Sequence, residues 1–361
     1  MTSRLPPREH GNASADRRPI LIVPYMWIGD FVRCHSVVQL LKSRWPDRPV
    51  DVLATRLCAP LVDYMPGVRR AILWDLPRKR LALGQHAALA QRLRAETYGT
   101  ALIMPRTWKS ALAPYLAGIP HRVGFLGEAR VGLLSEIRFG ERALPRMIER
   151  CASLALPRGA DFPAQWPRPR LEVSLMEVRD FAARHGLDQD GDAIALAPGA
   201  VGPSKRWPVA SYANLAADLI RRGYGVWVVG GPDEAPLAAD IARSAGPRVR
   251  DLTGQDLRHA ILALAAAKAA VSNDSGLLHV AAALGTPTIG IFGPTSAWHW
   301  APLNPLAATI ETPTQLGCRP CHKPTCRWGH HRCMREIGDA LVRDATLRAA
   351  SPAVSPLGSR A

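Results

Sequence analysis

Short apolar runs alternate with longer amphipathic segments along the first part of the chain. Runs at 20–23, 50–54, 71–76 and 100–105 are rich in branched or aliphatic side chains and have the length of buried strands. Between them, 31–46 and 86–98 carry apolar positions at helical spacing, and the first of these segments stops at a proline. Strands that alternate with helices in this way predict a parallel sheet covered on both faces.

The alternation breaks in a proline-rich stretch at 154–173 and then starts again, which indicates a linker between two domains. We therefore predict an α/β protein with two doubly wound domains and a cleft between them, at 19–165 and 166–345. The ends, 1–18 and 346–361, are expected to be disordered. The strands expected in the second domain are 193–199, 226–231, 250–254, 269–274 and 286–294. The expected helices are 174–186, 209–223, one between the strands 226–231 and 250–254, 257–268, and a further one that begins near 275.

Composition narrows the function classes. The chain has 361 residues, of which 47% are hydrophobic and 21% charged, and this excludes extensive disorder. The net charge of +16 favours an acidic partner, namely a nucleic acid, an anionic membrane surface or a phosphorylated substrate. There is no apolar run of about 18 residues and no signal-peptide core, so we expect a cytoplasmic protein that its charge can hold at the inner membrane face.

Four polar or backbone-exposing residues crowd the start of an alanine-rich helix in "SNDSGLLHVAAALGTPTIGIFGPTS", 272–296. Asp274, Ser275, Gly276 and His279 follow a buried strand directly. Free N–H groups and the helix dipole favour an anion at such a position, outside the carboxyl end of a strand. The alternative is that Asp274 or Ser275 only caps the helix and that His279 is a satisfied core residue.

Two further loops follow strands of the second domain. "APGAVGPSKRWP", 197–208, can wrap a phosphate, with Lys205 as a point charge, or it is a flexible basic loop. In "VVGGPDEAP", 228–236, Asp233 or Glu234 can accept hydrogen bonds from a ribose, or simply open the next helix.

Asp30 stands in "WIGD", where the first strand turns into a helix. Capping of that helix is one explanation for the carboxylate. The other is general-base catalysis, in which Asp30 faces the cleft and takes a proton from an acceptor hydroxyl.

A cysteine cluster lies near the end of the chain, in "CRPCHKPTCRWGHHRC". In a reducing cytoplasm, Cys318, Cys321, Cys326 and Cys333 suggest a structural zinc or iron–sulfur site, and free or redox-linked thiols are the alternative. The chemistry inferred below does not depend on this segment, 318–333.

Together, "IGD", "PGAVGPSKRWP" and above all "NDSGLLHVAAALGTPTIGIFGPTS" resemble the family 9 glycosyltransferases, the ADP-heptose:lipopolysaccharide heptosyltransferases. The segment "MPRTWKSALAPYLAGIPHRVGFLGEARVGLLSEIR", from 104, is more similar to heptosyltransferase II than to heptosyltransferase I. The resemblance runs from about 20 to 337. It implies a GT-B fold, with two Rossmann-like domains, an acceptor-binding first domain and a donor-binding second domain.

The resemblance also implies transfer of L-glycero-D-manno-heptose from ADP-heptose to the inner core of lipopolysaccharide, with inversion, in a Gram-negative bacterium. The acceptor implied is Kdo-lipid A that bears the first heptose. Asp30 would be the general base, and no metal would be required for the chemistry. Lys205 would hold the donor phosphate, and the pyrophosphate and heptose would be lined by Asp274, Ser275, Gly276, Leu277 and His279. Beside these, we expect Ser204 and Glu234, from the two loops described above, to contact the donor.

We expect Arg106, Lys109 and Arg122 to contact the anionic acceptor, unless they are ordinary surface cations. Two rival functions remain open at this point. One is a related enzyme of the same architecture that uses another nucleotide-sugar, or an epimerase. The other is a basic protein that binds nucleic acid through a zinc module; it predicts strongly salt-dependent binding and has little support, because few aromatic residues are available to stack on bases.

Overall fold

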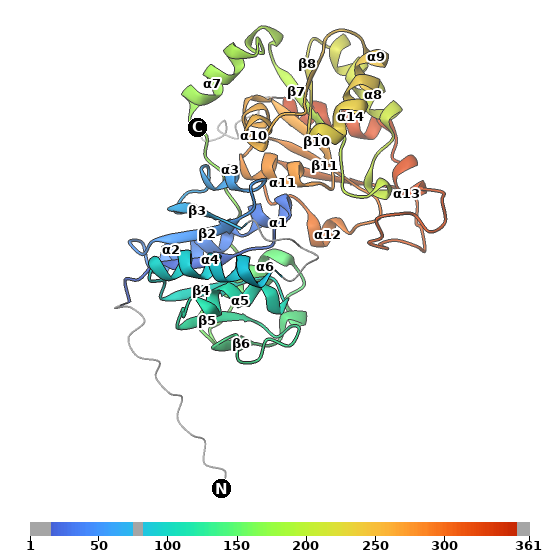
Figure 1. The fold of residues 1–361 in the computed structure, drawn as a ribbon. Coiled ribbons are helices and arrows are strands. Elements are labelled where there is room, and N and C mark those ends of the chain that lie inside the picture. Colours follow the sequence, from blue (N-terminus) through green and yellow to red (C-terminus); the bar gives the residue numbers. More distant parts are fainter. Residues whose placement is uncertain (1–15, 75–81, 352–361) are drawn as a thin grey trace, which may run out of the picture.

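The computed structural model describes residues 16–74 and 82–351, which form two α/β domains stacked on one another (Figure 1). Within the described residues, the N-terminal domain holds one six-stranded sheet, and every strand pairs in parallel with its neighbours. In spatial order its strands are β3 (Arg70–Leu73), β2 (Val50–Ala54), β1 (Ile20–Val23), β4 (Thr100–Ile103), β5 (His121–Phe125) and β6 (Glu136–Arg138).

Apolar side chains on both faces of this sheet are buried. Ile20 and Ile22 pack in one hydrophobic cluster, and Leu21 and Val23 pack in another, because successive side chains of a strand point to opposite faces. The helices of the domain are α1 (Ile28–Arg33), α2 (His35–Arg44), α3 (Ala59–Val62), α4 (Leu83–Ala95), α5 (Trp108–Leu116) and α6 (Met147–Ser153), with a 3₁₀ turn η1 (Glu141–Ala143).

The C-terminal domain repeats the same topology. Counted from the first strand of each domain, both sheets have the order 3-2-1-4-5-6, which is that of the Rossmann fold. The strands of the second sheet are, in spatial order, β12 (Ala307–Glu311), β11 (Thr288–Phe292), β10 (Ala269–Asn273), β7 (Ala193–Ala197), β8 (Gly225–Gly230) and β9 (Val249–Thr253).

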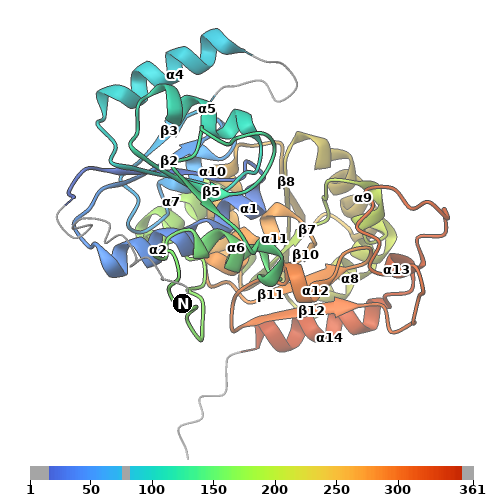
Figure 2. The same ribbon diagram turned by 90° about the horizontal axis from the view of Figure 1, so that it is seen from below.

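Helices flank the second sheet as well, and α14 lies along its underside in Figure 2. None of the helices in the described part of the chain has the length and apolar character needed to cross a bilayer. The helices are α7 (Leu175–Arg184), α8 (Val209–Arg221), α9 (Ala235–Ala245), α10 (Leu257–Ala266), α11 (Gly276–Ala283), α12 (Ala297–Trp300), α13 (Arg332–Arg335) and α14 (Asp339–Ala350), and the 3₁₀ turns are η2 (Asp188–Asp190), η3 (Pro203–Lys205) and η4 (Pro232–Glu234).

The predicted fold class is confirmed, and all nine predicted strands are found, with ends that differ by a few residues. The helix expected at 31–46 is two helices, α1 and α2, which meet at Cys34. The disorder expected from residue 346 is wrong for 346–350, because these residues belong to α14, which continues to Ala350. At the other end, residues 16–18 are ordered, since Asp16 forms ion pairs with Arg18 and Arg48. The remaining expected disorder, at 1–15 and 352–361, and the end of the strand expected at 71–76 lie outside the described residues.

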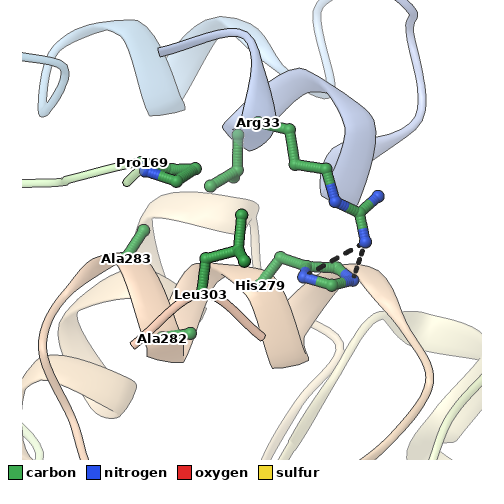
Figure 3. Close-up of a pocket in the computed structure, with 7 residues that line it drawn as sticks. Arg33, Pro169, His279, Ala282, Ala283 and Leu303 are labelled. Carbon is green, nitrogen blue, oxygen red and sulfur yellow. Dashed lines mark hydrogen bonds between the residues drawn. The ribbon is translucent and has the colours of Figure 1, made fainter. Parts of the chain in front are cut away.

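The segment between α6 and α7, at 154–174, contains neither helix nor strand, and the predicted domain boundary falls within it. The chain enters the second domain alongside a contact between α1 and α11, which belong to different domains (Figures 1 and 3). A single hydrophobic cluster includes residues of both domains, so the two domains share a continuous apolar contact.

Glycines allow α1 and α11 to approach closely. A Cβ on Gly276 would lie 2.7 Å from the Cβ of Ile28, and a Cβ on Gly29 would lie 2.7 Å from Cδ2 of His279. Real Cβ atoms do not tolerate such distances, so both positions require glycine for this contact. The close approach brings the carboxyl ends of the two sheets together.

Candidate active site

The two halves of the candidate site lie where ligands bind in sheets of this kind. In a doubly wound sheet, ligands occupy the crevice at the carboxyl ends of the strands, where the strand order reverses. That point lies between β1 and β4 in the first domain, and between β7 and β10 in the second. Asp30 follows β1, Lys205 follows β7, and Asp274 follows β10. The predicted residues therefore occupy both reversal points.

Asp30 does not cap its helix. The N-cap of α1 is Trp27, and no side chain accepts a capping hydrogen bond there. Asp30 lies instead in the first turn, where its Oδ1 accepts a hydrogen bond from Nη1 of Arg33 at 2.8 Å. The Asp30 side chain is 17% exposed. The capping interpretation is thus wrong, and the carboxylate is held by an arginine while it stays accessible.

Charges of the second domain act on Asp30. Burial raises the pKa of this carboxyl, the Arg33 guanidinium opposes the rise, Asp274 adds to it, and Lys205 lowers the pKa. Asp274 and Lys205 can exert this effect only because they lie close to Asp30 across the domain contact. A carboxyl with a raised pKa has the stronger basicity that proton abstraction needs.

The start of α11 is free of side-chain caps. Ser275 is the N-cap residue, with extended backbone angles of φ −136° and ψ 174°, but its side chain accepts no capping bond. Its hydroxyl lies 3.0 Å from that of Ser272. Asp274 caps no helix N–H either, because its side chain pairs with Lys205. The capping alternative is therefore wrong for both residues, and the first N–H groups of the helix have no side-chain acceptor in the described part of the chain.

Lys205 is held beside this helix start. Its Nζ donates to Oδ2 of Asp274 at 2.7 Å, and the side chains of Lys205 and Asp274 are 27% and 8% exposed. Asn273, a residue that sequence analysis did not single out, fixes the loop that carries Lys205. Its Nδ2 donates to the carbonyl of Pro198 at 2.6 Å, and its Oδ1 accepts from the N–H of Trp207 at 3.0 Å.

The other predicted donor residues are placed differently. Ser204 is buried, and its hydroxyl donates to the carbonyl of Lys323 at 2.5 Å, which anchors η3 to the cysteine-rich segment. Leu277 packs, partly buried, on the cluster shared by both domains. Glu234 accepts from the N–H of Gly231 at 2.9 Å and lies against Gly199, at the carboxyl ends of β8 and β7. Glu234 is thus at the predicted edge of the sheet, whereas Ser204 faces the protein.

His279 is buried against the first domain. Its exposed fraction is 6%, and its Nε2 lies 2.7 Å from Nη2 of Arg33 (Figure 3). Burial, together with the charges of Arg33 and Lys205, holds the pKa of His279 well below its ordinary value. The ring is therefore neutral, and Nε2 accepts the hydrogen bond from the guanidinium.

Arg33 was missed by sequence analysis. It is 4% exposed, and its guanidinium carbon lies 4.9 Å from the centre of the Trp300 ring. One signal was available, because a cation three residues after an acid on a helix can pair with it. Arg33 also lines a small crevice between the domains, with Pro169, His279, Ala282, Ala283 and Leu303 (Figure 3).

The three predicted acceptor contacts are not brought together. Arg106 follows β4 at the carboxyl edge; it is exposed and pairs with Glu141 at 3.1 Å. Lys109 lies on α5, near His86 of α4; burial lowers the pKa of His86, and the charge of Lys109 lowers it further. Arg122 lies near the amino end of β5, and its guanidinium donates to main-chain carbonyls, including that of Leu133 at 2.7 Å. Arg122 thus lies toward the opposite edge of the sheet and stabilises a turn.

The cysteine cluster does not form a coordination sphere in this structure. Cys318, Cys321 and Cys326 are partly exposed, Cys333 is buried, and the Sγ of Cys318 lies 4.0 Å from Nε2 of His330. Within 16–74 and 82–351, no three histidine, cysteine or carboxylate side chains are arranged to hold a metal ion. The zinc or iron–sulfur site stays a prediction that this geometry does not support.

Comparisons with known proteins identify the family to which this chain belongs. The family model for glycosyltransferase family 9 (heptosyltransferase) matches residues 86–331. Lipopolysaccharide heptosyltransferase 2 of Escherichia coli is 36% identical over 330 residues, which cover 88% of this chain and 94% of that protein. Lipooligosaccharide heptosyltransferase 2 of Haemophilus influenzae is 36% identical over 305 residues, which cover 81% of this chain and 88% of that protein.

The structure of E. coli ADP-heptose lipopolysaccharide heptosyltransferase II superposes with a TM-score of 0.82 at 34% identity, over 92% of this chain and 98% of that one. The match to the family model covers more than half of the chain, and the two relatives cover most of it. On this basis, the chain belongs to glycosyltransferase family 9, the heptosyltransferases.

Proposed function

We propose that this protein transfers L-glycero-D-manno-heptose from ADP-heptose to the inner core of lipopolysaccharide, onto an acceptor that already bears the first heptose. Its relatives are named lipopolysaccharide and lipooligosaccharide heptosyltransferase 2. The observation that carries the proposal is the position of Asp30 opposite Lys205 and the uncapped start of α11, at the facing reversal points of the two sheets.

On the acceptor side, Asp30 acts as the general base. Oδ1 is occupied by Arg33, and the described residues provide no donor to Oδ2. This oxygen takes the proton of the acceptor hydroxyl as the hydroxyl oxygen bonds to the anomeric carbon. Attack from one face of the sugar in a single displacement inverts the configuration at that carbon.

On the donor side, the bond between the anomeric carbon and the diphosphate oxygen breaks, and ADP leaves with the bonding electrons. Lys205 and the first N–H groups of α11 stabilise the charge that develops on this oxygen. In this proposal Asp274 keeps Lys205 in place rather than touching the diphosphate, because two anionic groups repel one another. Glu234, at the ends of β7 and β8, is suited to the ribose.

The acceptor is an anionic lipid-linked saccharide, and Arg106 is the predicted contact best placed for it. Arg106 stands at the carboxyl edge of the first sheet, as Asp30 does, and it is exposed. The net charge of +16 supports binding of the protein to the anionic membrane surface that holds such an acceptor. We therefore place the protein in the cytoplasm, at the inner face of the membrane.

The proposal is tested by incubating the protein with ADP-heptose and truncated lipopolysaccharide acceptors, and by measuring the product by mass spectrometry. Asp30→Asn should lower kcat by about 100-fold or more, because a general base contributes that much. Asp47→Asn, a change of an exposed carboxylate that makes no hydrogen bond or ion pair in the described structure, should leave turnover unchanged.

Near-normal turnover of Asp30→Asn would show that the base has been assigned wrongly. Calorimetry with ADP-heptose and with UDP-sugars tests which nucleotide-sugar the protein binds as donor. Tighter binding of a UDP-sugar would contradict the proposed substrate and support a related transferase or an epimerase.

A further inference from the structure

Arg33 is a buried cation at the contact between the two domains. It ends α1 of the first domain, and it contacts His279 on α11 and the carbonyl of Trp300 at the end of α12, both in the second domain. Burial of a guanidinium is costly unless its charge and its donors are satisfied. Here they are satisfied by one carboxylate, one imidazole, one carbonyl and the face of an indole ring.

The two arms of the guanidinium reach different domains. Nη1 donates to Oδ1 of Asp30, and Nη2 donates to Nε2 of His279, at 2.8 Å and 2.7 Å. The guanidinium is planar and rigid, so the position of one arm fixes that of the other. His279 in turn lies one turn after Gly276, on the helix whose N-terminus forms the donor site.

We propose that Arg33 is a positioning residue, which orients the Asp30 carboxylate with Oδ2 turned toward the acceptor and links it to His279, so that the base is aligned with the donor helix. This inference rests on the proposed function, in which Asp30 is the general base. Lysine cannot replace arginine in this arrangement, because one ammonium group lacks the planar fork that spans both partners.

The charges around this pair allow a specific pH test. Asp30 and Arg33 are faced by Tyr25 in the loop after β1, by Cys151 on α6, by Lys205 in η3, and by Asp274 and His279 of the second domain. His279 is neutral, so the nearby cations are Arg33 and Lys205, and of the two Arg33 has the larger effect on the carboxyl. Without Arg33, burial and Asp274 would raise the pKa of Asp30 further.

The test compares Arg33→Met and Arg33→Lys with the wild type, in steady-state kinetics over a range of pH. Arg33→Met should lower kcat about 100-fold, because the base is no longer oriented. It should also move the acid limb of kcat/KM up by about one pH unit or more, because an opposite charge is removed from the carboxyl. Arg33→Lys should keep the acid limb near its wild-type position but remain slow. Arg44→Met, which removes an exposed arginine at the end of α2, serves as the matched control and should change neither quantity.

A purely structural role for Arg33 would lower kcat without moving the acid limb, and this result would overturn the inference, as would wild-type kinetics of Arg33→Met. Should Arg33→Met fail to fold, as judged by circular dichroism, the more conservative Arg33→Lys still tests the inference, because wild-type kcat of this variant would overturn it. Arg33→Ala with added guanidinium chloride at millimolar concentration provides a second test. Guanidinium should raise kcat of this variant, and absence of any rescue would count against the inference.

Asp30→Asn separates the two proposals. If Asp30→Asn is inactive while Arg33→Met is unaffected, only the role of Arg33 fails; if Asp30→Asn is active, the base assignment fails as well.

Discussion

Replacement of Lys205 by methionine removes the only charge that the loop after β7 directs toward Asp274 in the described structure. Methionine keeps most of the volume of the side chain, so the loop anchored by Asn273 should remain in place. The substitution therefore changes mainly the electrostatic interactions of the site. The diphosphate loses a cation, and the Asp274 carboxylate, 8% exposed, loses its partner at 2.7 Å.

The size of the effect follows from the interaction that is removed. A hydrogen bond to a charged group contributes about 1.5–3 kcal/mol, and each 1.4 kcal/mol is a factor of ten. Affinity for ADP should therefore fall roughly 10- to 150-fold, and kcat/KM for ADP-heptose should fall at least as much, because the leaving group gains its charge in the transition state.

Part of this loss should come from the unpaired Asp274, which repels the diphosphate once Lys205 is gone. The double variant Lys205→Met/Asp274→Asn should therefore bind ADP more tightly than Lys205→Met alone. Isothermal titration calorimetry measures the affinity of both variants for ADP. A coupling between Lys205 and Asp274 appears as non-additive changes in the free energy of ADP binding. An affinity of Lys205→Met within twofold of the wild type would refute the assignment of Lys205 to the diphosphate.

Three further predictions follow from the same geometry. Because burial raises the pKa of Asp30 and the base must be ionised to act, kcat/KM should fall as the pH drops through a value above the ordinary aspartate range, and an acid limb at or below about pH 4 would contradict this. Gly276→Ala should destabilise the protein by about 1–3 kcal/mol in thermal unfolding, because its Cβ would lie 2.7 Å from that of Ile28, whereas Gly84→Ala, with no atom within 4 Å, should not; equal midpoints would show that the helix contact is loose. Because Lys205 and α11 supply the leaving-group stabilisation, transfer should persist in EDTA, and loss of activity that Mg²⁺ restores would show that a metal ion takes part.

The central strands of both sheets could be predicted because parallel strands buried on both faces are continuous apolar runs. The pattern failed at β5, β6 and β12, which begin with polar residues or have exposed faces. β6 and β12 are edge strands, where one side of the strand needs no partner and the apolar signal is weak. The break between α1 and α2 also left no apolar signature, since the residues on both sides are buried.

In the site, sequence reasoning placed Asp30, Lys205 and Asp274 at the correct edges of the sheets, because the position of a residue relative to its strand determines its edge. It could not place Arg33 against His279, since 246 residues separate them and only the tertiary fold brings them together. For Ser204 and Arg122, sequence reasoning predicted ligand contacts that the structure does not favour, because the donor groups of both side chains bond to backbone carbonyls. Such local hydrogen bonds leave no mark in a single sequence.

A crystal structure with ADP bound tests the central claim most directly. The account predicts that the diphosphate lies within hydrogen-bonding distance of Nζ of Lys205 and of the first N–H groups of α11, with Asp30 facing it from the first domain. A diphosphate bound away from Lys205 and Ser275 would contradict the account.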